Sequence, residues 1–149
     1  MAAIIGLDEA PTREVCAEAG VVLANLNCPG QLVISGEAEK ITKACELAKA
    51  KGAKRAIPLP VAGAYHSPLM ASAQPKLAAE LAKARLSTPV VPVIANVSAQ
   101  PHGADVSAKL VEQVCASVLW ENSMRYLLAQ GFTRFIELGP GTADRKSVV

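Results

Sequence analysis

The chain has 149 residues, of which 51% are apolar and 19% charged, and its formal net charge is +2. This balance excludes an intrinsically disordered chain, which combines few apolar residues with a high net charge. No basic face stands out, which argues against nucleic-acid binding, and no apolar run reaches the ~20 residues needed to span a bilayer.

The amino terminus and the cysteines indicate a cytoplasmic protein. The opening stretch MAAIIGL lacks a basic segment and meets Asp8 at once, unlike a signal peptide. The four cysteines are Cys16, Cys28, Cys45 and Cys115. They form no CxxC pair, and three of them fall where apolar helix faces are expected. We therefore expect reduced core cysteines and no metal site.

Residues 1–60 alternate short apolar runs with helical patterns. The clearest helix covers 37–52, where apolar residues recur at i, i+3, i+4 and i+7 and Gly52 provides the stop. The predicted elements are a strand over 2–7, a helix over 8–20, strands over 21–27 and 32–36, the helix over 37–52 and a strand over 53–60. This β-α-β-β-α-β order predicts a ferredoxin-like domain over 1–60, a scaffold that implies no function by itself.

Residues 61–149 continue the α/β pattern but contain few strands. The predicted elements are a helix over 67–86 that Pro75 kinks or restarts, a strand over 90–97, helices over 106–119 and 120–131, and a strand over 132–141 that runs into a glycine-rich turn. A sheet of two strands is marginal. We therefore expect an incomplete second domain, loosely folded in isolation, with unpaired edges and exposed apolar faces.

The stretch GAYHSPLM, residues 63–70, contains one of only two histidines in the chain. A histidine that precedes a helix is, without further context, more often a cap or a satisfied polar residue than a catalytic base. His102, in QPHGAD, is interpreted as a surface loop residue.

Five stretches together resemble the malonyl-CoA:acyl carrier protein transacylases. They occur in the family's order and at roughly its spacing, over residues 1–141. They are MAAIIGLDE (1–9), ANLNCPGQLVISG (24–36), AKRAIPLPVAGAYHSPLM (53–70), PVIANVSAQP (92–101) and FIELGPG (135–141). The resemblance implies a ferredoxin-like subdomain, residues 1–60, inserted into an α/β-hydrolase-like acyltransferase domain, of which residues 61–149 form the C-terminal part.

The resemblance also implies an activity and a base. The family transfers malonyl from coenzyme A to the phosphopantetheine thiol of acyl carrier protein in fatty acid synthesis, by a ping-pong mechanism without a cofactor. His66 takes the general-base role, because an imidazole within hydrogen-bond reach can accept the proton of a serine hydroxyl. The backbone carbonyl of Gln113 would orient the imidazole. For a carbonyl acceptor we expect the residue type to matter little.

Substrate contacts are expected at six further residues, which are Tyr65, Asn25, Asn27, Gln31, Lys54 and Arg55. By resemblance, Tyr65 would narrow the acyl pocket, and the amides of NLNCPGQ would line the cleft between subdomains. Lys54 and Arg55 could meet the acidic carrier protein or the phosphates of coenzyme A. The alternatives are a core tyrosine, turn chemistry for NLNCPGQ and an ordinary solvated basic pair.

No G-x-S-x-G nucleophile motif occurs in the sequence. The resemblance places the family's serine, its oxyanion loop and its malonyl-binding arginine upstream of MAAIIGL. The polar end TADRKSVV, residues 142–149, resembles a truncation or a read-through tail. Three hypotheses follow: a fragment of a transacylase, a non-catalytic ferredoxin-like module that binds acyl carrier protein, or one half of a split enzyme.

Overall fold

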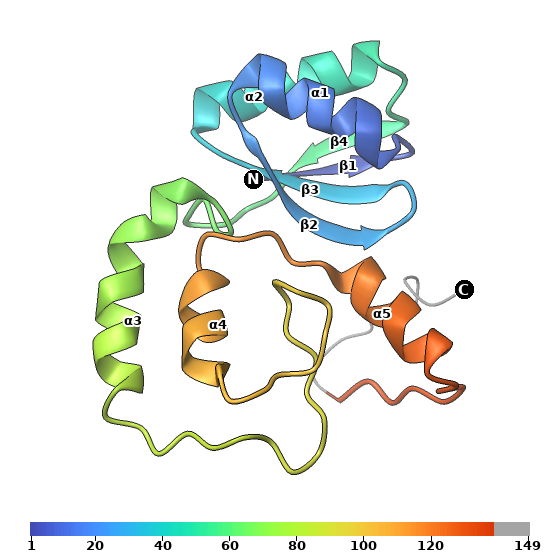
Figure 1. The fold of residues 1–149 in the computed structure, drawn as a ribbon. Coiled ribbons are helices and arrows are strands. Elements are labelled where there is room, and N and C mark those ends of the chain that lie inside the picture. Colours follow the sequence, from blue (N-terminus) through green and yellow to red (C-terminus); the bar gives the residue numbers. More distant parts are fainter. Residues whose placement is uncertain (139–149) are drawn as a thin grey trace.

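The computed structural model, which describes residues 1–138, begins with a sheet covered on one face by two helices (Figure 1). The elements are β1 (Ala2–Ile5), α1 (Glu9–Ala19), β2 (Val22–Cys28), β3 (Gln31–Ser35), α2 (Ala38–Ala50) and β4 (Arg55–Pro58). The predicted order β-α-β-β-α-β is confirmed. The hydrophobic periodicity was therefore sufficient to locate every element of this half.

The four strands form one antiparallel sheet in the order β2-β3-β1-β4. Ala2 of β1 lies opposite Ile34 of β3 on one side and Pro58 of β4 on the other. At the other end of β1, Ile5 lies opposite Gln31 and Arg55. The central strands are β3 and β1. Of the two edge strands, β4 has 4 residues and β2 has 7, and β2 is the edge that faces the rest of the chain.

The core between the sheet and the helices contains small and branched apolar residues, as the aromatic content of 3% predicts. Ile4, Val15 and Ile34 are fully buried in it. Gly20 ends α1 in the left-handed conformation, with φ of 70°, and its amide donates to the Cys16 carbonyl, as expected of a helix stop. Cys16 and Cys45 belong to the same core and carry free thiols.

Residues 61–138 lie on the side of the sheet edge formed by β2 (Figure 1). They contain one 3₁₀ helix and three α-helices. These are η1 (Pro68–Ala73), α3 (Gln74–Leu81), α4 (Val106–Glu112) and α5 (Trp120–Ala129). The helix predicted over 67–86 is therefore shorter and divided. Pro75 lies in the first turn of α3, where a missing amide costs nothing, so the proline restarts the helix as one of the two predicted outcomes.

The helix predicted over 106–119 is wrong beyond Glu112. The chain turns after α4, and Val118 then lies alongside β2 in a parallel bridge with Asn25. The Val118 amide donates to the Ala24 carbonyl at 2.8 Å, and the Leu26 amide donates to the Val118 carbonyl at 2.9 Å. An unpaired edge strand is a strong hydrogen-bonding template, so it overrides the helical pattern of this segment.

The strands predicted over 90–97 and 132–141 are also wrong, as far as the structure describes them. Residues 90–97 form only an isolated bridge, Ile94 with Pro101, closed by a turn in which Ala99 has φ of 53°. Residues 132–138 form no strand, and the expected turn at 139–141 and the tail at 142–149 lie outside the described residues. A strand needs a neighbouring strand along its length, whereas 90–97 pairs only with the turn that follows it, through Ala95 with Gln100 and Val93 with His102.

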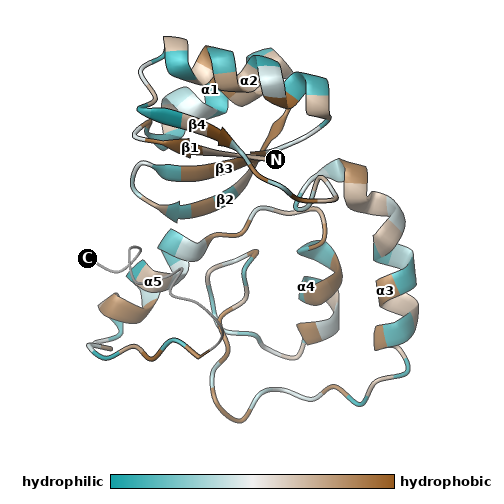
Figure 2. Ribbon diagram, turned by 180° about the vertical axis from the view of Figure 1, so that it is seen from behind, coloured by the Kyte–Doolittle hydropathy of each residue, from teal (hydrophilic) through white to brown (hydrophobic). Residues whose placement is uncertain are grey.

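Large apolar side chains are exposed in this second half, as expected from its missing strands. Val90 is 100% exposed and Leu138 is 89% exposed, whereas Ile4 is 0% exposed. Figure 2 shows the corresponding brown stretches on the segments below α3 and α4 and after α5. The helices among residues 1–138 are all too short or too polar to cross a lipid bilayer.

We predict that amide hydrogen exchange divides the chain into two parts. Amides of β1 and β3 should exchange slowest, because they lie within the sheet and its core, and amides of 90–97 and 132–138 should exchange fastest. Exchange followed by mass spectrometry on the intact 149-residue chain measures this. Equal protection across both halves would contradict the prediction.

Candidate active site

His66 lies in the connection between β4 and η1, in a strained backbone conformation. Its φ of 56° is in the left-handed region, which non-glycine residues seldom adopt. Such a conformation costs on the order of 1–3 kcal/mol and persists where surrounding contacts hold it, often at functional sites. The next residue, Ser67, is buried, and its hydroxyl donates to the Ala64 carbonyl at 2.6 Å.

The imidazole of His66 is held by two backbone carbonyls. Its Nδ1 lies 3.0 Å from the oxygen of Gln113 and 3.1 Å from the oxygen of Ala116. A carbonyl oxygen only accepts hydrogen bonds, so Nδ1 must carry the proton. Nε2 is then the nitrogen with a free lone pair, and a neutral imidazole in this tautomer can accept a proton there.

The structure therefore brings together His66 and the Gln113 carbonyl, 47 residues apart in sequence. Ala116 was missed, because nothing in the sequence indicates which carbonyl a turn directs outward. Gln113 is the residue that caps the C-terminus of α4, and carbonyls at a helix end have no partner within the helix. The early end of α4 thus exposes the acceptors that hold the imidazole.

Two side-chain amides hold the end of α4, and neither was singled out from the sequence. Nε2 of Gln74, at the start of α3, donates to the Val111 carbonyl at 3.0 Å. Nδ2 of Asn96 donates to Oε1 of Gln113 at 3.2 Å. Asn96 lies within PVIANVSAQP, which would have drawn attention to it only through the family resemblance.

Tyr65 lies on the surface beside His66. It is 43% exposed, so the alternative that it is a core residue is wrong. Its ring packs over Gly63, where an added Cβ would approach the ring carbons to 3.3 Å. Tyr65 is therefore a surface residue whose ring lies against Gly63.

The five polar residues predicted in 1–60 do not converge on His66. Asn25 comes nearest through its bridge with Val118, two residues after Ala116. Gln31 and Arg55 flank Ile5 at one end of the sheet, and Lys54 directly precedes Arg55, with its stem against Gly6. β4 lies three strand spacings from β2, roughly 14 Å. Asn27 lies in β2 beyond Asn25, towards the Gln31 end.

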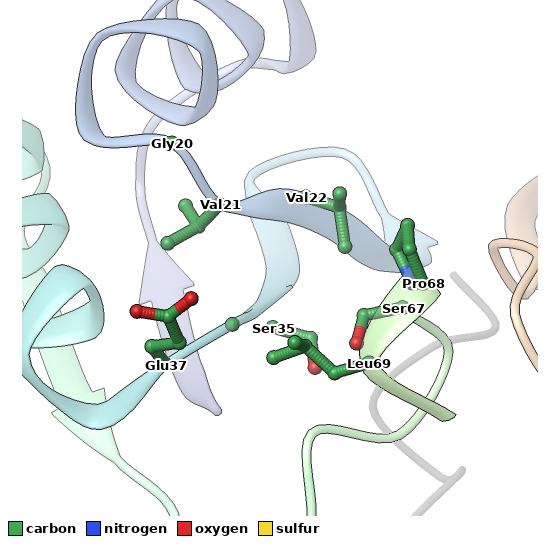
Figure 3. Close-up of a pocket in the computed structure, with 9 residues that line it drawn as sticks. Gly20, Val21, Val22, Ser35, Glu37, Ser67, Pro68 and Leu69 are labelled. Atoms are coloured by element: carbon green, nitrogen blue, oxygen red, sulfur yellow. The ribbon is translucent and has the colours of Figure 1, made fainter. Parts of the chain in front are cut away.

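A small pocket marks where the histidine loop meets the sheet. Its volume is about 170 Å³, and Ser67, Pro68 and Leu69 line it opposite Val22 and Ser35 (Figure 3). Sites for drug-sized ligands measure ~300–1,000 Å³, so this pocket is too small for a coenzyme A thioester. We interpret it as a packing gap at the junction, not as the substrate site.

The buried cysteines are poor candidates for a nucleophile. Burial raises the pKa of Cys16 to about 11, and it also raises the pKa of Cys28 and of Cys45. The reactive form is the thiolate, so these thiols are inert at neutral pH. Within residues 1–138 no three His, Cys, Asp or Glu side chains gather as a metal site.

Comparisons with known proteins agree with this arrangement. The family described as "Acyl transferase domain" matches residues 1–140. A malonyl CoA-acyl carrier protein transacylase from Bacillus subtilis is 50% identical over 148 residues, covering 95% of this chain and 47% of the relative.

Solved structures show the same fold. The malonyl-CoA:acyl carrier protein transacylase of Xanthomonas oryzae superposes with a TM-score of 0.93 at 39% identity, over 98% of this chain and 48% of that one. A malonyl-transacylase structure solved in complex with its type II PKS acyl carrier protein superposes with a TM-score of 0.84 at 37% identity, over 87% and 44%. The chain spans about half the length of the relatives it matches.

We predict that the neutral imidazole of His66 is the Nδ1–H tautomer. A long-range ¹H–¹⁵N correlation spectrum of the labelled chain should show Nε2 as the unprotonated, pyridine-type nitrogen, because two carbonyls require a donor at Nδ1. A His102→Ala variant identifies the His66 signals. A pyridine-type Nδ1 would contradict the hydrogen bonds to Gln113 and Ala116.

Proposed function

This chain belongs to the acyl transferase domain family, and we propose that it is the histidine-bearing part of an enzyme that transfers malonyl from coenzyme A to acyl carrier protein. The observation that carries the proposal is His66, with Nδ1 fixed by two carbonyls and Nε2 left as a base. The 50% identity to a transacylase supports the choice of substrates. The free buried thiols agree with a reducing compartment such as the cytoplasm.

We further propose that residues 1–60 are a ferredoxin-like small subdomain and that residues 61–149 are the C-terminal part of an α/β-hydrolase-like domain. The antiparallel order β2-β3-β1-β4 with two helices on one face supports the first assignment. The exposed apolar residues of 90–93 and 132–138 support the second, because they need a further layer to cover them.

In the proposed first half-reaction, a serine supplied from outside residues 1–149 attacks the thioester carbonyl of malonyl-CoA. Nε2 of His66 takes the hydroxyl proton as the bond from serine oxygen to carbonyl carbon forms. The carbon–sulfur bond then breaks, and the imidazolium returns the proton to the departing thiolate. Two carbonyl acceptors at Nδ1 stabilise the transient positive charge without being able to remove the proton.

In the proposed second half-reaction, the phosphopantetheine thiol of acyl carrier protein attacks the malonyl-serine ester. Nε2 of His66 now accepts the thiol proton and returns it to the serine oxygen as the ester bond breaks. The protein thus ends in its starting protonation state. No metal or organic cofactor is required by either step.

The other predicted residues divide into three groups by position. We propose that Tyr65, beside His66, limits the width of the acyl site, a discrimination worth ~1–3 kcal/mol per methyl group. Asn25 and Asn27 are proposed to line the cleft along β2. Lys54 and Arg55 lie at the far end of the sheet, where they are proposed to contact the carrier protein or the coenzyme's phosphates. Gln31, expected among the residues that line the cleft, lies at the same end of the sheet, opposite Ile5.

We predict that the chain becomes active when the missing half is restored. The portion of the Bacillus subtilis relative that this chain leaves uncovered would be fused ahead of Met1 and assayed for malonyl transfer to holo acyl carrier protein. The fusion should turn over, His66→Ala should lower its rate by about 10²–10⁴-fold, and His102→Ala should not. The 149-residue chain alone should show no transfer, because its sequence contains no G-x-S-x-G nucleophile motif.

The same assay separates the three hypotheses. Activity when the two halves are mixed as separate chains would favour a split enzyme over a fragment. Saturable carrier-protein binding by the 149-residue chain, with no turnover in any combination, would instead support a non-catalytic module. Transfer by the chain alone, or an unaffected His66→Ala fusion, would overturn the proposed role of His66.

A further inference from the structure

We propose that the side chains of Asn96 and Gln113 form a positioning pair that directs the Gln113 carbonyl at His66. This inference rests on the proposed function and adds two residues that act through the base without touching the substrate. It implies, against the expectation from the sequence, that the residue type at position 113 matters. The backbone oxygen of Gln113 accepts the hydrogen bond from the imidazole, and the side chain of Gln113, bonded to Asn96, restrains the backbone that carries this oxygen.

Two hydrogen bonds converge on Gln113, one donated by the loop and one donated by the base. Asn96 Nδ2 donates to Gln113 Oε1 at 3.2 Å, and the carbonyl of the same Gln113 accepts from His66 Nδ1 at 3.0 Å. All three side chains are partly buried, so water competes poorly for these bonds. A change at Asn96 is therefore transmitted to the imidazole through a single residue.

Gln113 needs such support because of where it lies. It caps α4, with φ of −61° and ψ of −18°, and after it the chain leaves the helix through irregular turns. Helix ends fray, and a carbonyl at a frayed end points in many directions. The Asn96 amide fixes the side chain of Gln113 and so restricts rotation of its backbone.

Asn96 is itself anchored to the first half of the chain. Its carbonyl accepts from the Leu119 amide at 2.9 Å, and Leu119 directly follows Val118, which is hydrogen-bonded to Ala24 and Leu26 of β2. Asn96 therefore connects the edge of the sheet with the residue that orients the base. The pair should respond to any displacement of one half of the chain relative to the other.

A double-mutant cycle on the 149-residue chain tests the pair directly. Asn96→Ala, Gln113→Ala and the double variant all keep the Gln113 backbone carbonyl. The readouts are the His66 tautomer and the solvent-exchange rate of its Nδ1 proton, measured by NMR. Asn122→Ala, an exposed asparagine on α5, is the matched control, and circular dichroism checks that each variant is folded.

If the two side chains act as one unit, each single variant should speed Nδ1 proton exchange on the order of fivefold and shift the tautomer balance towards Nε2–H. The double variant should then show no larger effect than either single one. Additive effects, or a His66 signal unchanged by Asn96→Ala, would overturn the proposal. Loss of fold in Asn96→Ala alone, with Gln113→Ala folded and its His66 signal unchanged, would overturn it as well.

The same three variants in the active fusion provide a second test. We expect kcat to fall on the order of fivefold with KM unchanged, since the base is displaced but the substrate contacts are kept. A fall in kcat without the NMR change would contradict action through His66. If the unsubstituted fusion shows no transfer, the proposed function fails, and the NMR cycle still decides whether the pair positions the imidazole.

Discussion

The hydrogen bonds from His66 Nδ1 to the carbonyls of Gln113 and Ala116 are the interaction on which the candidate site depends. They fix the tautomer, and they tie the loop after β4 to the turn after α4. They also offset a strained histidine backbone that a free loop would relax. A carbonyl suits this position because it orients an imidazole and stabilises its charge without taking its proton.

The same turn joins the two halves of the chain. After supplying the two carbonyls, it adds Val118 to the edge of β2 and so satisfies amides and carbonyls that the sheet would otherwise expose. The first half has a closed core, whereas the second half keeps large apolar side chains such as Val90 and Ile136 on its surface. The molecule is thus a sheet with a closed core and a partly covered extension, and the base lies where the two meet.

The sequence predicts the first half well and the second half poorly, for a physical reason. In 1–60 each apolar pattern has a partner within the same 60 residues, so local periodicity and global packing agree, as for Ile41 of α2 and Ile34 of β3. In 90–97 and 132–138 the apolar pattern of a strand is present, but the described chain offers no neighbouring strand. The helix predicted through Val118 is wrong for the opposite reason, because pairing with a free sheet edge outweighs the helical pattern there.

The site shows a similar division. The family resemblance led to both His66 and Gln113. The histidine is recognised from the residues around it, and Gln113 from its matching position in the family. The amides that hold the site, Asn96 and Gln74, come from separate segments, and only the folded chain brings them to the end of α4. Gln31 and Arg55 lie together at a distant end of the sheet, opposite Ile5. The sequence stretches that contain them resemble the family, but the fold does not bring these two side chains to the base.

The most direct test of the central claim is a crystal structure of the active fusion with its serine in place. We predict that His66 Nε2 lies within hydrogen-bond reach of the serine Oγ, about 2.6–3.2 Å, while Nδ1 keeps its bonds to Gln113 and Ala116. A serine oxygen facing another base would contradict the claim, as would a His66 ring turned so that Nδ1 faces the cleft.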